Sequence, residues 1–419
     1  MKPQELKSLD RRMTKFLEDL LAAMGRSEWR HWARIYLEGL LLDGERKSIE
    51  PIASRIPGAD VQGLRQFVGQ SPWAVEEVQR RLALKVVDLL SEPEVWIVDD
   101  TSFPKAGKHS VGVARQYCGA LGKVANCQVA VTLHWSSDET SCPLGWRLYL
   151  PEEWMKDTQR TSEVKLLPGT EYKTKTELAL ELIDQMLGWE LPPLPVVADS
   201  FYGNDFEFRE ELRKRDLFYA VAVEPSTVVW TTDPNVPLPP PKSTGRPRKY
   251  PPADSLSRPQ DLLAVAQQLS AAAWRNIAWR EGTKGIQHSR YAMVKVWPAH
   301  RWQAREPIER VPEWLLIDWP VEEAKPVKYW LAQLSPQLPG IRHFVKIARA
   351  RWRVELDYRE LKDELGLDHF EGRHWLGWYH HVTLVTIAYA FLRSEQLRTK
   401  KNSWYDLASS AQDSAEGAD

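Results

Sequence analysis

The stretch Val95-Trp96-Ile97-Val98-Asp99-Asp100 decides the fold class, because it joins an apolar run of strand length to a pair of carboxylates. A second such run, residues 194–198, leads into Asp199. A third carboxylate, Glu355, lies within a charged pattern of helical spacing between residues 349 and 367. Two strand-end aspartates and one helical glutamate can converge on a pair of divalent metal ions, an arrangement that supports cleavage and transfer of phosphodiester bonds.

Outward from these runs, strand and helix patterns alternate. Runs rich in β-branched and aromatic residues predict strands at 126–135, 145–150 and 217–223, and helical spacing predicts helices at 174–189 and 206–215. Strands first, followed by alternating helices and strands, predict an α/β fold with a mixed sheet flanked by helices.

The same patterns divide the chain into five regions. Residues 1–90 are predicted to form a helical domain for DNA-end binding or dimerisation, and residues 91–224 the first part of a catalytic core. Residues 225–310 are predicted to be a β-rich insertion with a basic loop, because the prolines between 234 and 258 exclude a helix or a central strand. Residues 311–395 complete the core with the Glu355 helix, and the polar residues 396–419 are predicted to be a disordered tail.

Composition excludes some classes of protein. No apolar stretch approaches the roughly 18 residues of a membrane span, and the N-terminus lacks the apolar core of a signal peptide. The three cysteines lack metal-site spacing, which is typical of reduced thiols in a cytoplasmic protein. The 20 tryptophans fit either a Trp-rich core or a surface that stacks on bases or on sugar rings.

The three carboxylates suit a hard divalent cation. Mg²⁺ prefers oxygen ligands and takes few protein carboxylates per ion, so Asp100, Asp199 and Glu355 are the predicted catalytic and metal-binding residues. Alternation along a strand places Asp99 on the face opposite Asp100. Asp199 has a competing role as a helix cap, since Ser200 and Phe201 follow it.

Cationic residues cluster around these carboxylates, although the net charge is only −1. Some share or border the helical face of Glu355, some follow Asp100 on a predicted loop, and some form a Pro-rich segment that resembles the core of an AT-hook. The alternative is a solvated helix, a basic loop and a basic linker. The predicted DNA-binding residues of these three groups are Arg351, Lys362, Arg359, Tyr358, Lys105, Lys108, His109, Arg115, Arg246, Arg248 and Lys249.

Several motifs occur in a fixed order along the chain. Arg351, Glu355 and Lys362 match the last three positions of Tyr-x2-Arg-x3-Glu-x6-Lys, with Ala348 at the tyrosine position, and this spacing selects Glu355 over Glu360 and Glu364. In this ordered set the chain resembles bacterial insertion-sequence transposases of the DDE type, in the subgroup called DDE superfamily endonucleases. The other matching stretches are Asp100-Thr101-Ser102, residues 99–117, Ala198-Asp199-Ser200-Phe201-Tyr202-Gly203 and residues 365–373.

The resemblance implies an RNase H-like core with a β-rich insertion before the Glu355 helix. It implies two Mg²⁺ ions, replaceable by Mn²⁺, and cut-and-paste transposition at terminal inverted repeats. The partners would be the double-stranded DNA of the transposon ends and of the target, bound by a homodimer in the bacterial nucleoid, with no membrane. It also implies a flipped base stacked on a tryptophan of the insertion, for which Trp297, Trp302, Trp274 and Trp279 are candidates.

Two other functions stay open at this point. A domesticated or inactive relative would bind DNA without transposing it, and Ala348 leaves room for that hypothesis. A glycoside hydrolase would use paired carboxylates and tryptophans. The Arg and Lys residues around Glu355, and the absence of a secretion signal, argue against the hydrolase.

Overall fold

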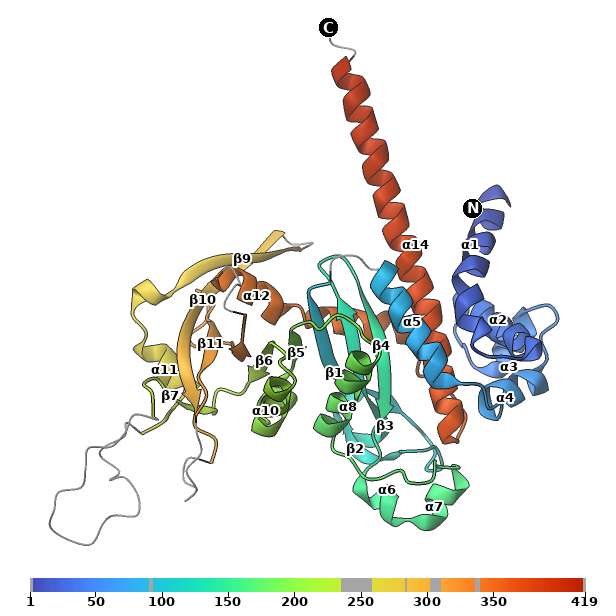
Figure 1. Ribbon diagram of the computed structural model, residues 1–419, viewed down its shortest axis with the longest axis horizontal. Helices are drawn as coiled ribbons and strands as arrows, with labels where there is room; N and C mark the ends of the chain where they lie inside the picture. Colours follow the sequence, from blue (N-terminus) through green and yellow to red (C-terminus); the bar gives the residue numbers. More distant parts are fainter. Residues whose placement is uncertain are drawn as a thin grey trace, which may run out of the picture. The chain divides into compact units, whose positions relative to one another are not determined.

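The computed structural model describes residues 3–89, 93–234, 258–282, 285–301, 310–335 and 340–416 (Figure 1). The chain forms two compact units. The first comprises Met1–Pro93, Asp99–Pro192 and Trp352–Asp419, and the second comprises Glu94–Val98 and Pro193–Arg351. Strand β1 (Val95–Pro104) therefore supplies residues to both units and places Asp100 in the first.

The N-terminal part of the first unit is helical, as its periodicity predicts. In α2, Ala33, Tyr36, Leu37 and Leu40 recur at helical spacing and are buried. Asp60 caps the amino end of α4, since its side chain accepts a hydrogen bond from a backbone N–H of the first turn. The helices are α1 (Pro3–Ala22), α2 (Ser27–Leu41), α3 (Ile49–Arg55), α4 (Val61–Gly69) and α5 (Val75–Leu89). Their predicted role in DNA-end binding or dimerisation stays a prediction.

The strands of the first unit are β1, β2 (Ala114–Cys118), β3 (Lys123–Ser136) and β4 (Ser141–Leu148). β3 lies between β2 and β1 in the strand order and pairs antiparallel with both β2 and β4. Helix α8 (Lys175–Gly188) starts with a capping box and buries the apolar face that the sequence predicts. The short elements of this unit are η1 (Gly119–Leu121), α6 (Glu152–Lys156) and α7 (Thr158–Glu163).

Two C-terminal helices complete the first unit: α13 (Trp352–Asp363) and α14 (Trp375–Glu416). α14 contacts β4 and the N-terminal helices, and its residues 380–391 are all buried. The helix continues to Glu416, which differs from the predicted disordered tail over 396–419. The sequence offers a reason, since no proline or glycine interrupts this polar segment before Gly417.

The second unit begins with parallel pairing. β5 (Val196–Ala198) lies between β1 and β6 (Tyr219–Val223), parallel to both, with Trp96 opposite Val196. From β6 the strand order continues antiparallel through β12, β11 and β10, and β9 pairs antiparallel with β10. The remaining elements are α9 (Ser200–Gly203), α10 (Phe206–Lys214), β7 (Val228–Trp230), β8 (Gln260–Asp261), α11 (Leu262–Gln268), η2 (Ala271–Ala273), β9 (Arg275–Gly282), β10 (Gly285–Pro298), β11 (Glu313–Asp318), β12 (Lys328–Gln333) and α12 (Ile341–Arg349).

The predicted fold class is confirmed: parallel and antiparallel pairs form a mixed sheet of the RNase H-like kind, flanked by helices. Within the second unit, β10 of the predicted insertion (225–310) pairs directly with β11 of the predicted core (311–395). The predicted domain boundaries stay a prediction. The three cysteines are free and buried. Within the described ranges, no helix has both the length and the apolar character needed to cross a membrane.

Candidate active site

Asp100 lies inside β1, in the first unit. Every residue of this strand from Val95 to Phe103 is buried except Asp100, whose side chain is 23% exposed. Its Oδ2 forms an ion pair with Lys175 Nζ at the start of α8. The neighbouring Asp99 is buried, and its Oδ1 accepts the Asp100 N–H at 2.8 Å. Of the two adjacent aspartates, Asp100 is therefore the one accessible to a ligand.

The prediction that Asp100 ends its strand is wrong, because β1 continues to Pro104. Thr101 and Ser102 are polar but buried. Lys362 of α13 stabilises this extension, since its Nζ donates to Thr101 Oγ1 at 2.8 Å and to the Ser102 carbonyl at 3.0 Å. Asp100 therefore lies inside the strand rather than at its carboxyl end.

Asp199 follows β5 in the second unit and also acts as the cap that its sequence context suggests. Its Oδ1 accepts from the N–H groups of Phe201 at 3.0 Å and Tyr202 at 3.4 Å, which caps α9. Its Oδ2 lies 3.8 Å from Arg351 Nη2. Capping and the approach of a cation therefore use different oxygens of this carboxylate.

Glu355 is exposed in the first turn of α13. A carboxylate is favoured there because the amino end of a helix carries a partial positive charge. The prediction of one continuous helix from 349 to 367 is wrong. α12 ends at Arg349, α13 begins at Trp352, and Arg351 lies in the turn between them. The four-residue spacing from Arg351 to Glu355 therefore does not place both on one face of a helix.

Lys362 was predicted to bind DNA, but its ammonium group is directed at β1 through the two hydrogen bonds described above. It also lies 5.5 Å from the centroid of the Phe103 ring. Burial lowers the pKa of Lys362. Through these contacts Lys362 joins α13 to β1 within the first unit.

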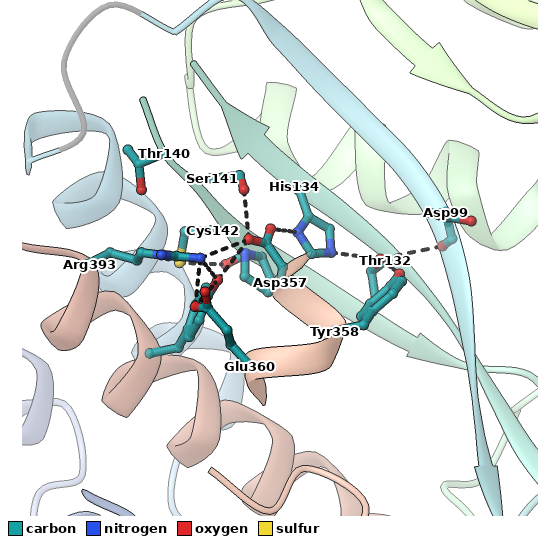
Figure 2. Close-up of polar contacts among 12 residues, drawn as sticks. Asp99, Thr132, His134, Thr140, Ser141, Cys142, Asp357, Tyr358, Glu360 and Arg393 are labelled. Atoms are coloured by element: carbon teal, nitrogen blue, oxygen red, sulfur yellow. Dashed lines mark hydrogen bonds and ion pairs between the residues drawn. The ribbon is translucent and has the colours of Figure 1, made fainter. Parts of the chain in front are cut away.

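The side of α13 that faces away from Glu355 carries a buried polar cluster (Figure 2). Asp357 is fully buried, and its carboxylate contacts His134 Nδ1 at 2.8 Å, Ser141 Oγ at 2.7 Å and Tyr389 OH at 2.7 Å. Burial alone would raise the pKa of Asp357, but the hydrogen bonds and the His134 charge outweigh it, so the net direction is down. Burial and the nearby Asp357 charge raise the pKa of Cys142.

The other predicted DNA-binding residues differ in accessibility. Lys105 donates to the Phe370 carbonyl at 2.7 Å, and burial lowers its pKa to about 8. Tyr358 is buried, with its hydroxyl 2.5 Å from Thr132 Oγ1, and its predicted contact with DNA stays a prediction. Among the described residues of the predicted set, the exposed ones are Lys108, His109, Arg115 and Arg359.

The remaining predicted DNA-binding residues and the base-stacking candidates lie in other segments of the chain. The basic residues Arg246, Arg248 and Lys249 lie outside the described residues, as does Trp302. Trp297 is partly exposed on β10, with Lys295 Nζ 5.6 Å from its ring centroid. Of the other candidates for base stacking, Trp279 lies against Arg349, and Trp274 packs edge-on against Trp319.

The sequence reasoning missed two residues of the first unit, one of which contacts Asp100. Lys175 is its ion-pair partner; the capping signal Thr174-x-x-Glu177 predicts a helix start there, but no sequence signal pairs it with a residue 75 positions away. Tyr117 on β2 is 64% exposed and lies two residues from Arg115, hence on the same face of that strand. An aromatic beside a cation suits contact with a nucleic acid.

The three predicted ligands are divided between the units, since Asp100 and Glu355 belong to the first and Asp199 to the second. In the part of the chain that the structure describes, no group of three or more His, Cys, Asp or Glu side chains is arranged to hold a metal ion. The donor chemistry nevertheless fits a hard cation. Asp100 and Asp199 each present a carboxylate oxygen toward a positive group, Lys175 and Arg351 respectively.

Comparison with known proteins gives the family. A sequence model of the DDE superfamily endonucleases matches residues 19–286, which is more than half of the chain. The matched residues include Asp100 and Asp199 and stop before Glu355, so the Glu355 assignment rests on the spacing of its own motif.

A curated relative points the same way. The chain is 34% identical over 187 residues to a probable transposase for insertion sequence element IS701 from Microchaete diplosiphon. The match covers 44% of this chain and 46% of the relative, so it spans about half the length of that protein. Together with the confirmed mixed sheet, the family match leads to one conclusion: this chain belongs to the DDE superfamily endonucleases.

Proposed function

We propose that the chain is the transposase of an insertion sequence, a metal-dependent DNA endonuclease and strand transferase that acts in the cut-and-paste mode at terminal inverted repeats. The observation that carries the proposal is the setting of Asp100, the one accessible residue of β1 between Val95 and Phe103, in the same unit as the exposed Glu355. The family match and the name of the IS701 relative support the reaction class.

In this proposal Asp100, Asp199 and Glu355 hold two Mg²⁺ ions, and Mn²⁺ can replace them. When bound, such ions activate an attacking oxygen and stabilise the leaving one. Asp100 and Asp199 must first release the cations that they face, Lys175 and Arg351. Each of these side chains then becomes available to a phosphate of the bound DNA.

The chain's exposed cations would position the DNA. Lys108, His109 and Arg115 follow Asp100 along the chain, and Arg359 lies one turn beyond Glu355 on α13. Contacts to phosphates fix the register of a duplex without selecting sequence. Arg246, Arg248 and Lys249 would enter a minor groove, and Trp297 would stack on a flipped base. The transposon ends and the target would be held by a homodimer in the bacterial nucleoid.

A strand-cleavage assay tests this function. DNA that carries the ends of the element encoding this chain is incubated with the full-length protein, with Mg²⁺ or with a chelator. We expect nicking at the element end only with the metal, and its loss in Glu355→Ala. Glu364→Ala, an exposed carboxylate of the same segment, is the matched control and should retain cleavage. Cleavage that survives chelation, or survives Glu355→Ala, would contradict the proposal.

A second candidate, a relative that binds DNA without cleaving it, is favoured by Ala348. This residue stands where the resemblance expects a tyrosine, and it is only 2% exposed in α12. The same assay separates the two functions, because binding to the element ends without any metal-dependent nicking would establish the second.

A further inference from the structure

A buried polar network lies behind the helix that carries Glu355. Asp357 follows Glu355 by two residues, and a rotation of about 100° per residue places their side chains on nearly opposite faces of α13. Glu355 is exposed, whereas Asp357 has no solvent exposure. The buried side of α13 therefore carries a carboxylate beside the apolar side chains of Val354 and Leu361.

Four residues on three other elements hold this carboxylate, part of which can be followed in Figure 2. Asp357 Oδ2 lies 2.8 Å from His134 Nδ1 on β3. Asp357 Oδ1 accepts from Ser141 Oγ on β4 at 2.7 Å and from Tyr389 OH on α14 at 2.7 Å, with Arg393 Nη2 at 3.4 Å. The helix is thus fixed in position against two strands and one helix of the first unit.

The network continues to β1. His134 Nε2 lies 3.0 Å from Thr132 Oγ1, which donates to the Asp99 carbonyl at 3.4 Å. Tyr358, the next residue of α13, also reaches Thr132 Oγ1 through its hydroxyl. Asp99 in turn accepts the N–H of Asp100. A continuous set of hydrogen bonds therefore joins α13 to the residue immediately before Asp100.

A second connection reaches β1 on the other side of Asp100. Lys362, two turns after Glu355, donates to Thr101 Oγ1 and to the Ser102 carbonyl. α13 consequently holds β1 both before and after Asp100. Both connections lie within the first unit, which contains Asp100 and Glu355.

The kinds of side chain in this network favour a role in positioning α13 over a role in stabilising the fold. Replacing buried charged and hydrogen-bonded groups by well-packed apolar residues is often neutral or stabilising, so the burial of Asp357 is weak evidence of a gain in stability. Hydrogen bonds of defined direction do, however, select one arrangement of the elements that they join. Displacement of a reacting group by about 1 Å can cost about 10²-fold in rate.

We propose that Asp357 and His134 are positioning residues that fix α13 on β3 and so hold the carboxylate of Glu355 in its working position relative to Asp100. This inference rests on the proposed metal-dependent cleavage. Neither residue touches the DNA or the metal ions in this account. Their effect passes through the position of Glu355.

The test compares two variants of the full-length protein that make the same chemical change on α13. Asp357→Asn keeps the shape of the side chain but removes the charge that binds His134. Asp363→Asn is the matched control, because it makes the same change at an exposed carboxylate of the same helix. We expect Asp357→Asn to slow cleavage at saturating DNA about 10- to 100-fold. Asp363→Asn should stay within about twofold of the unchanged protein.

A purely structural role would change only the fraction of folded protein. The discriminating readouts are therefore the Mg²⁺ concentration at half-maximal cleavage and the affinity for Mn²⁺ alone, measured by calorimetry without DNA. In Asp357→Asn we expect the first to rise several-fold and the second to weaken several-fold, with DNA affinity within about twofold. Unchanged metal dependence, with cleavage reduced only in proportion to the folded fraction seen by circular dichroism, would overturn the inference.

Two further variants keep the test decisive if Asp357→Asn does not fold. Ser141→Ala and Tyr389→Phe each remove one donor to Asp357 and should raise the half-saturating Mg²⁺ concentration without weakening DNA binding. No change in metal dependence in both would overturn the inference. Loss of the proposed function has a separate signature, since it would appear as cleavage that persists in Glu355→Ala.

Discussion

Asp199 and Asp100 are both carboxylates that follow apolar runs, yet the two are held in different ways. Asp199 is held by its immediate neighbours, because its Oδ1 caps α9 through the N–H groups of Phe201 and Tyr202. This arrangement needs only a few consecutive residues. Its sequence signature is short, and the position of the side chain relative to its own helix depends little on the rest of the unit.

Asp100 is held by residues that are distant in the sequence. Thr132 bonds the residue before it, Lys362 bonds the two residues after it, and Lys175 pairs with its carboxylate. A carboxylate positioned in this way depends on the packing of several elements. A local cap and a tertiary network can therefore both position a carboxylate. The position set by the network is more sensitive to mutations elsewhere in the chain.

The largest expected effect separates charge from capping at Asp199. Asp199→Asn keeps a good capping side chain but removes the charge, so cleavage should fall about 10³-fold, since several kcal/mol of metal-based stabilisation is lost. Asp199→Ala should lose the same activity and also about 1 kcal/mol of unfolding free energy. Cleavage assays and urea unfolding measure the two quantities. Equal stability of both variants would show that the cap contributes nothing.

The next effect tests the tertiary support of Asp100. Lys362→Met removes the two hydrogen bonds to β1, so we expect cleavage to fall about 10- to 100-fold with DNA affinity nearly unchanged. If Lys362 instead bound a phosphate, affinity would fall and the salt dependence of binding would lose about one unit of slope. Binding titrations at several salt concentrations decide between these outcomes. Arg359→Ala is the control expected to show the change in slope.

A third prediction concerns Ala348, in the helix that leads to Arg351 and so to the local environment of Asp199. Because Ala348 is buried, Ala348→Tyr should lower the unfolding free energy by about 1–3 kcal/mol through overpacking. Arg342→Ala, an exposed change in the same helix, should stay within about 0.5 kcal/mol. Denaturant unfolding checks both values. A tyrosine variant as stable as the parent would mean that the space exists and that the motif can be restored.

The smallest effect is a pH dependence at Lys105, just beyond β1. Burial lowers its pKa to about 8, below the unfolded value of about 10.4, so the folded state loses this proton first. Stability should therefore rise as the pH increases from about 8 toward 10, because the unfolded state then binds more protons. Lys105→Met should remove this contribution, whereas the exposed Lys108→Met should keep it. Identical pH profiles for both variants would contradict the burial of this ammonium group.

Local sequence was enough to predict some parts of the molecule. The apolar face of α8, the strand β6 and the cap at Asp199 all follow from neighbouring residues. The break between α12 and α13 was missed because no proline or glycine marks residues 350 and 351. The extension of β1 was missed because Thr101 and Ser102 are polar.

Other parts depend on contacts that periodicity does not encode. His134 and Asp357 are 223 residues apart, and their contact forms only when β3 and α13 pack together. The sequence places Asp357 within a charged helical pattern, for which a solvated helix was the alternative interpretation. The buried carboxylate of Asp357 fixes the inner face of this helix by hydrogen bonds. The exposed outer face, which carries Glu355, gives no sign of these contacts.

The most direct test of the claim that these carboxylates act through bound metal uses DNA with sulfur in place of a non-bridging oxygen at the scissile phosphate. Sulfur binds Mg²⁺ poorly and the softer Mn²⁺ better. Cleavage of the sulfur-substituted DNA should therefore be slow with Mg²⁺ and restored by Mn²⁺ in the unchanged protein, and absent with either ion in Glu355→Ala. Equal cleavage of the oxygen and sulfur substrates with Mg²⁺, or cleavage without any divalent ion, would contradict the claim.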